Sequence, residues 1–167
     1  MIWLPLKIFG ALLIASSGLM LGCSLSRKLK NRRDFLAKFA VFLNTLATGL
    51  RYSADDIFTL VSLSAGDFTP LHIARQERTL PFEQVWGKKL ASFARQYSLS
   101  GQDVGLLREF GEKLGKTDLE GQLKHIELYK TLFAKQLLQV EEAIAKKARL
   151  YKTLGLFGGV SAALMMI

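Results

Sequence analysis

The sequence is poor in the residues that cross-link small folds through disulfides or bind metals. Of its 167 residues, one is cysteine (Cys23) and only three are proline. This composition excludes a disulfide scaffold, a collagen-like chain and a disordered chain. Two histidines are present, His72 and His125, and neither has a cysteine or a second histidine one helical turn away. A zinc site therefore lacks ligands, and we expect both histidines to be solvated or hydrogen-bonded within the fold.

Catalytic and nucleotide-binding motifs are missing too. Gly111, Gly115 and Gly121 loosely resemble a phosphate-binding loop, but no G-x-x-x-x-G-K-[ST] motif occurs. Glu127 follows His125 by two positions, and residues two apart point to different faces of a helix. The sequence therefore predicts a protein that is not an enzyme, with no catalytic residue, no metal ligand and no cofactor site.

Basic charge is concentrated in two short stretches. The formal net charge is +9, from 23 Lys and Arg against 14 Asp and Glu. Residues 34–145 hold thirteen of these cations and all fourteen acids, so this segment has a net charge of −1. A nucleic-acid-binding domain needs basic charge along a folded face, so we expect no nucleic-acid partner. Apart from Lys7, the remaining cations flank that segment: Arg27, Lys28, Lys30, Arg32, Arg33, Lys146, Lys147, Arg149 and Lys152.

An apolar stretch precedes the first basic stretch. Residues 8–25 carry no charge, and with residues 2–7 they are long enough for a helix to cross a hydrocarbon core of about 30 Å. A cleaved secretory signal would have its basic region first, and a lipoprotein signal ending at Cys23 would have a smaller residue than Leu21. We therefore predict a transmembrane helix over 1–25 and a basic juxtamembrane segment over 26–33, with the following chain in the cytoplasm.

A shorter apolar stretch follows the second basic stretch. Residues 154–167 are uncharged, but as one helix they reach only about 21 Å. We predict a short hydrophobic membrane segment over 153–167, with a buried core helix as the alternative. Both apolar ends contain two glycines spaced four residues apart. Chance explains this spacing as well as close packing of helices does, and such packing could occur within one chain or in a homo-oligomer. The two pairs are Gly18 with Gly22 and Gly155 with Gly159.

Residues 34–152 are expected to form an all-α cytoplasmic domain. The segment shows no sustained alternation of apolar and polar residues, and its apolar positions recur at helical spacing. The expected helices cover 34–51, 54–65, 70–77, 82–97, 102–114 and 118–151. Together they predict an antiparallel bundle of five to six helices, with membrane segments at both ends.

Capping residues and apolar spacing support these helices. Ser53 and Ser100 are placed as N-caps, Thr117 with Glu120 forms a capping box, and Gly115 is placed as a left-handed C-cap. A seam with seven apolar residues among eight positions is predicted along the last helix: Leu119, Leu123, Ile126, Lys130, Phe133, Leu137, Val140 and Ile144.

The corner before the last helix is rich in charge. Its helix, glycine and capping box account for most of the local sequence, and the remaining charged side chains predict a docking surface for a protein partner. The candidate partner-binding residues are Glu109, Glu112, Lys113, Lys116, Asp118 and Glu120.

This corner also carries a family resemblance. The pattern Phe110-Gly111-x-x-Leu114-Gly115-x-Thr117-Asp118-x-Glu120-x-Gln122, followed by Ile126-x-Leu128 and Leu150-Tyr151-Lys152-x-Leu154-Gly155, resembles stage III sporulation protein AB of endospore-forming bacteria. That family commonly shows an acid-Ile-x-Tyr-x-x-Thr-Pro-Leu stretch in its first half. Residues 50–57 here keep only the tyrosine, Tyr52, so a partner contact made by this stretch is expected to differ.

The resemblance implies a function. The family's domain is similar to inner-membrane platform proteins of type II secretion and type IV pilus machines. This implies a platform component of the channel between mother cell and forespore, in the mother-cell membrane facing the forespore. Its helical domain would dock the cytoplasmic sporulation ATPase and other channel-complex proteins. The alternative is a membrane-tethered regulator or adaptor that sequesters a soluble signalling protein.

Overall fold

The computed structural model describes the backbone of residues 3–53 and 55–166, and the side chains of residues 26–53 and 55–150. Within these ranges the chain is helical and contains no strand, which confirms the predicted all-α class. The elements are α1 (Trp3–Tyr52), α2 (Ile57–Ala65), the 3₁₀-helices η1 (Thr69–Leu71) and η2 (Arg75–Thr79), α3 (Phe82–Gln96), α4 (Gly101–Lys113) and α5 (Leu119–Met166).

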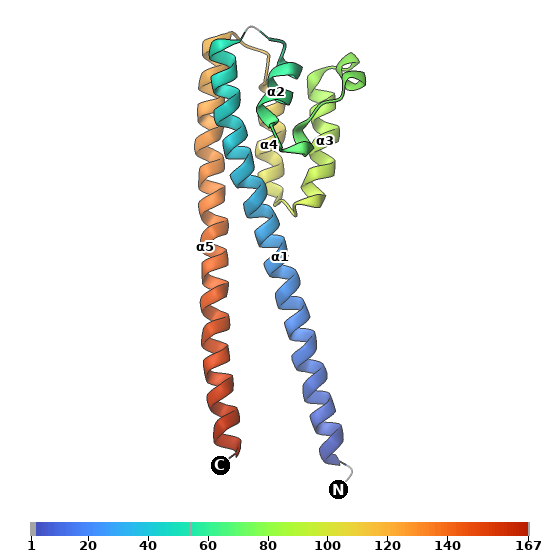
Figure 1. The fold of residues 1–167 in the computed structure, drawn as a ribbon, viewed down its shortest axis with the longest axis vertical. Helices are drawn as coiled ribbons and strands as arrows, with labels where there is room; N and C mark the ends of the chain where they lie inside the picture. The colour runs from blue at the N-terminus through green and yellow to red at the C-terminus, as the bar shows by residue number, and fades with distance from the viewer. Residues whose placement is uncertain (1–2, 54, 167) are drawn as a thin grey trace.

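Two long helices form the frame of the molecule. α1 and α5 run antiparallel and pack against each other, while α2, α3 and α4 gather beside one half of the pair (Figure 1). Both chain ends lie at the same end of the molecule, and the α1–α2 turn and the start of α5 lie at the other, which we call the distal end (Figure 1). The predicted helices 34–51 and 118–151 are thus parts of longer helices.

No helix within the fully described residues is long and apolar enough to cross a membrane. The membrane segments predicted over 1–25 and 153–167, with Cys23 and the paired glycines, lie outside the residues whose side chains are described.

The predicted helix over 70–77 is wrong, because two 3₁₀ turns replace it. The backbone becomes extended between them, with ψ of 130° at His72 and 150° at Ala74. The Glu77 carboxylate accepts a hydrogen bond from the Ala74 N–H at 2.8 Å and starts the second turn. An ion pair of 3.2 Å from the Lys89 ammonium to the Glu77 carboxylate ties that turn to α3.

Two of the predicted helix boundaries are confirmed. Ser100 caps α4, because its hydroxyl accepts from the Asp103 N–H and the Asp103 carboxylate accepts from the Ser100 N–H. Gly115 has a φ of 79°, a left-handed conformation that glycine adopts without steric cost.

Two other caps differ from the prediction by one to three residues. The Ser53 hydroxyl bonds to the Asp55 carboxylate instead of capping, and Asp56 caps α2 by accepting from the Phe58 N–H. At α5 the cap is Asp118, whose carboxylate accepts from the Gly121 N–H at 3.1 Å. In both places an acid one residue before the helix replaces the predicted hydroxyl, since its carboxylate reaches the first free N–H groups.

The core is aromatic. Phe39 of α1 packs against Phe110 of α4 and Phe133 of α5, with ring centroids 5.7 and 4.7 Å away. Trp86 of α3 joins the same cluster, and its indole N–H donates to the Leu107 carbonyl at 2.7 Å. These rings join the four helices into one core, and aromatic burial of this kind dominates the stability of a small bundle.

The buried face of α5 is rotated from the predicted seam. Ile126, Phe133 and Val140 are buried as predicted, but Leu119 is 50% exposed. The buried line instead follows Gln122, Ile126, Tyr129, Phe133, Gln136 and Val140. Its polar members are retained because their side chains are hydrogen-bonded, and that cannot be read from apolar spacing.

Candidate docking surface

The α4–α5 corner is held by one buried glutamine. The Gln122 carbonyl oxygen accepts from the Gly115 N–H at 3.0 Å, and its amide donates to the Thr117 hydroxyl at 2.9 Å. A longer bond of 3.4 Å runs from the same amide to the Lys113 carbonyl. Gln122 is only 3% exposed, so these bonds are shielded from water. The network gives the corner one fixed shape.

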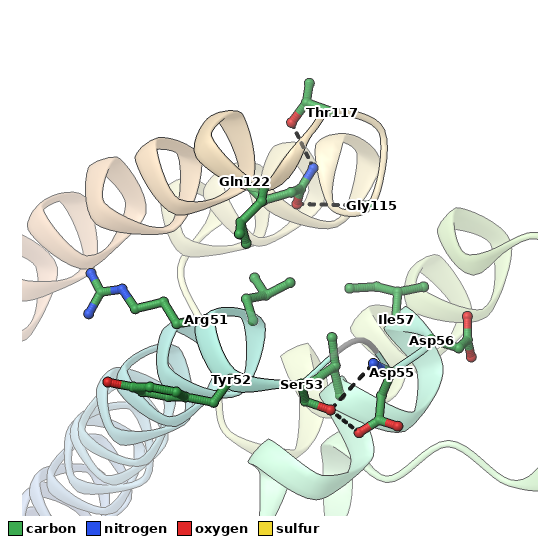
Figure 2. Close-up of a pocket in the computed structure, with 12 residues that line it drawn as sticks. Arg51, Tyr52, Ser53, Asp55, Asp56, Ile57, Gly115, Thr117 and Gln122 are labelled. Carbon is green, nitrogen blue, oxygen red and sulfur yellow. Dashed lines mark hydrogen bonds between the residues drawn. The ribbon is translucent and has the colours of Figure 1, made fainter.

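A pocket of about 690 Å³ lies beside this corner at the distal end. Figure 2 shows its two walls: Gly115, Thr117 and Gln122 on one side, and Arg51, Tyr52, Ser53, Asp55, Asp56 and Ile57 on the other. The structure therefore places the corner that carries the family resemblance next to the stretch around Tyr52. These two features lie about 60 residues apart in the sequence and were considered separately there. We call this feature the distal pocket. Its full lining is Leu50, Arg51, Tyr52, Ser53, Asp55, Asp56, Ile57, Leu60, Gly115, Thr117, Leu119 and Gln122.

The rim of the distal pocket exposes apolar as well as charged groups. Tyr52 is 87% exposed and Leu119 is 50% exposed, while Arg51, Asp55 and Asp56 add charges. Apolar groups framed by polar ones are characteristic of a surface that a partner covers.

The six candidate partner-binding residues are all exposed, and four of them already have intramolecular roles. Lys116 pairs with Glu83 of α3 at 2.6 Å, and Glu120 pairs with Lys124 at 2.7 Å. Asp118 caps α5, and Glu109 accepts a hydrogen bond from the Tyr129 hydroxyl at 3.2 Å.

Glu112 and Lys113 complete the set. Neither side chain makes a hydrogen bond or ion pair among the residues whose side chains are described. Their charges are therefore the ones at the corner best placed to meet a partner.

The pKa of Tyr129 is raised to about 12, mainly by burial, then by the hydrogen bond to Glu109 and the charges of the Glu109 and Glu112 carboxylates. Each carboxylate disfavours the phenolate, so Tyr129 stays a neutral donor to Glu109 at neutral pH.

The cations of the predicted basic junction differ in their surroundings. Arg32 turns into the bundle, where its guanidinium pairs with Asp103, while Arg33 pairs with Asp34 and Glu141. Arg27, Lys28, Lys30 and Lys146 are exposed. Lys147 is half-buried and Arg149 exposed; Lys152 lies outside the residues whose side chains are described.

Sequence reasoning missed Asp103 and Gln136 as members of a buried network. The Arg32 guanidinium donates to both, and Asp103 is fully buried. The only local signal was an acid three residues after Ser100, which predicts a capping box and says nothing of a partner on α1.

Both histidines bond to backbone carbonyls, as expected. His125 Nε2 lies 3.1 Å from the Phe110 carbonyl oxygen and the ring stacks on Phe110, while His72 Nε2 lies 2.5 Å from the Gly66 carbonyl oxygen. In the part of the chain that is fully described, no group of three or more His, Cys, Asp or Glu could hold a metal ion.

Comparison with known proteins gives the family. A model of the family described as stage III sporulation protein AB matches residues 7–167. The chain belongs to this family. Stage III sporulation protein AB of Bacillus subtilis (strain 168) is 23% identical over 184 aligned positions, covering 97% of this chain and 99% of that relative. No solved structure matches the chain.

Family membership assigns the chain a role connected with sporulation. The match to the family covers the distal pocket and both basic stretches, so these features lie within the region that the family describes.

Proposed function

We propose that the protein is a non-catalytic platform component of the sporulation channel between mother cell and forespore. The two ends of the chain tether it in the mother-cell membrane, and the bundle docks a cytoplasmic ATPase and couples it to the secretion-like assembly. The observation that supports this most is the place of the distal pocket, at the end of the molecule opposite both termini.

The geometry suits such a role. A chain tethered by both ends presents its opposite end farthest from the membrane, where a soluble partner has unhindered access. The Gln122 hydrogen bonds hold the corner in place, so little conformational entropy is lost there when a partner binds. The buried aromatic core and the packing of α1 on α5 connect this surface to the two long helices that lead toward the chain ends. A rigid link can pass position or motion from one end to the other.

The test exchanges the two corner charges that have no intramolecular bond. Glu112→Lys combined with Lys113→Glu keeps the net charge and breaks no hydrogen bond or ion pair among the described side chains. Full-length protein is solubilised in a mild detergent from sporulating cells and pulled down. We expect wild type to retain the sporulation ATPase. The exchanged variant should retain about ten-fold less or lower, because the loss of one or two charge contacts weakens binding by about that factor.

A matched control uses exposed charges of α5. Lys135→Glu with Glu142→Lys also conserves net charge, lies outside the corner, and is expected to retain the ATPase. Equal retention by wild type and both variants would remove the corner from the docking surface. Absence of the ATPase from every pull-down, with one soluble protein bound one to one instead, would favour the tethered regulator.

A further inference from the structure

A second cleft lies between the two long helices. It has a volume of about 490 Å³ and is lined by Lys30, Arg33 and Asp34 of α1 and by Glu141, Ile144 and Ala145 of α5. Its lining residues come from the middle of each long helix. Figure 1 shows α1 and α5 diverging from the bundle toward the chain ends. We call it the α1–α5 cleft.

Two cations and two acids line this cleft, so the charges of the lining sum to zero, and both acids share Arg33. The Arg33 guanidinium lies 3.1 Å from the Asp34 carboxylate and 3.6 Å from the Glu141 carboxylate. Lys30 makes no ion pair among the residues whose side chains are described. Lys30 is thus the lining cation whose ammonium is left to contact an anion, and the excess of positive charge is supplied by the cations that flank the cleft.

The charges around the cleft are one-sided. Every charged side chain before Asp34 and after Glu142 is a cation, so the electrostatic potential becomes more positive from the cleft toward the chain ends. Arg27 on α1 and Lys147 on α5 follow within about one turn of the lining residues, and Lys147 is half-buried. An anion in the cleft is thus attracted from both helices.

The uncharged part of the lining suggests what the anion is attached to. Ile144 and Ala145 provide an apolar wall beside the cations. A free phosphate gains nothing from such a wall, whereas the glycerol and first methylenes of a lipid are apolar. Lys30 also lies only five residues, about 8 Å of helix, beyond the predicted apolar segment ending at residue 25. Headgroups occupy a layer of similar thickness on each side of the hydrocarbon, on the order of 5–8 Å.

We propose that the α1–α5 cleft binds the phosphodiester headgroup of an anionic phospholipid, with Lys30 as the residue that contacts the phosphate. This inference rests on the membrane tether of the proposed function. It adds a specific lipid site to that tether, which would fix the angle between α1 and α5 at the membrane surface.

The test compares two substitutions that change the net charge equally. Lys30→Glu removes the cleft cation, whereas Lys28→Glu lies two positions away on the same helix, outside the lining. Full-length protein in a neutral detergent is titrated with dioctanoyl phosphatidylglycerol, dioctanoyl phosphatidylcholine and inorganic phosphate, with binding read by native mass spectrometry. We expect wild type and Lys28→Glu to bind phosphatidylglycerol within about two-fold of each other, and Lys30→Glu to bind about ten-fold or more weakly.

Several results would overturn the proposal. Equal loss in Lys28→Glu and Lys30→Glu would mean diffuse attraction without a site. Binding of phosphatidylcholine as tight as phosphatidylglycerol would remove the anionic requirement, and phosphate binding as tight as the lipid would make this a simple anion site. A neutral Lys30→Gln variant and far-UV circular dichroism verify that any loss comes from charge and not from unfolding.

The outcome is separable from the proposed function. Short-chain lipid is titrated in solution, so it measures the cleft whether or not the chain is tethered in cells. Cell fractionation of wild type tests the tether by itself. Lys30→Glu is expected to keep the ATPase in a detergent pull-down, and the Glu112/Lys113 exchange is expected to keep phosphatidylglycerol binding.

Discussion

Arg32 and Asp103 form a two-point ion pair across the bundle, although they are 71 positions apart in the sequence. Nε of Arg32 lies 2.6 Å from Oδ2 of Asp103, and Nη2 lies 3.0 Å from Oδ1. The same Nη2 donates to Gln136 of α5 at 3.1 Å. One guanidinium therefore links α1, α4 and α5, and the Asp103 carboxylate also accepts from the Ser100 N–H in the capping box of α4.

Removing the Asp103 carboxylate is expected to destabilise the bundle strongly. Asp103→Ala leaves the Arg32 charge without its carboxylate partner and removes the acceptor for the Ser100 N–H, at a cost of about 3–5 kcal/mol in the free energy of unfolding. Asp34→Ala removes an exposed partner of Arg33, and its cost is expected to stay below about 1 kcal/mol. Urea unfolding in detergent, followed by far-UV circular dichroism, measures both. Equal costs would mean that the buried pair contributes no more than a surface pair.

A variant that lacks both charges measures the net contribution of this ion pair to stability, including the cost of burying the two charges. Arg32→Met with Asp103→Leu removes both charges, so no unpaired charge remains in the bundle. We expect this double variant to be more stable than Asp103→Ala alone, because a buried pair replaced by apolar residues costs less than a broken one. A double variant less stable than the single one would show that the network holds the helices in register through its hydrogen bonds.

Gly111 is expected to be irreplaceable for a steric reason. A Cβ at this position would lie 2.1 Å from Cδ1 of Trp86, which is 2% exposed and held by its bond to Leu107. Gly111→Ala should therefore destabilise the protein by about 1–3 kcal/mol and shift the tryptophan emission. Gly105→Ala in the same helix meets nothing within 4 Å and should be neutral or stabilising by up to about 1 kcal/mol. Similar stabilities for the two variants would contradict the close Trp86 packing.

Local sequence predicted much of this fold and little of its polar interior. The α4 cap at Ser100 and the Gly115 turn depend on residues within one or two helical turns, and these predictions are confirmed. Arg32 lies in a run of five cations, and nothing nearby distinguishes it from its exposed neighbours. Its role depends on a partner on a distant helix, which spacing along one helix cannot reveal.

The same limit applies to the distal pocket. Both of its walls were noticed in the sequence, one as a charged corner and one as a divergent stretch around Tyr52. Their meeting depends on the antiparallel packing of α1 and α5, which places the end of one helix beside the start of the other. The predicted seam of α5 also leaves out Gln122 and Gln136, which are buried because their side chains have hydrogen-bond partners.

Gln122 is expected to control the order of the corner. Gln122→Ala leaves the Gly115 N–H and the Thr117 hydroxyl without their partner, and should cost about 1–3 kcal/mol in stability. Gln139→Ala, at an exposed position of the same helix, should cost less than about 0.5 kcal/mol. Hydrogen exchange adds a local readout, since the Gly115 amide should exchange faster only in the Gln122 variant. Unchanged exchange at Gly115 would show that the glutamine does not fix the turn.

The last prediction concerns the ionisation of Tyr129. Its pKa is raised from 10.0 to about 12, mainly by burial and then by the hydrogen bond and charge of Glu109. The unfolded phenol ionises near pH 10 and the folded one near pH 12, so the stability contribution of Tyr129 is complete below about pH 10. It is lost as the pH rises from there toward 12, because the unfolded state then releases its proton first.

Absorbance at 295 nm measures this pKa directly. The titration of wild type minus that of Tyr129→Phe isolates one phenol, and its midpoint is expected near pH 12. Glu109→Gln should move the midpoint toward 10 without reaching it, because the desolvation of the phenol remains when the nearby negative charge is gone. Glu112→Gln should move it less, since that carboxylate acts only at a distance. A wild-type midpoint at pH 10 would mean that water reaches the Tyr129 hydroxyl, and that the Glu109 contact does not tie α4 to α5.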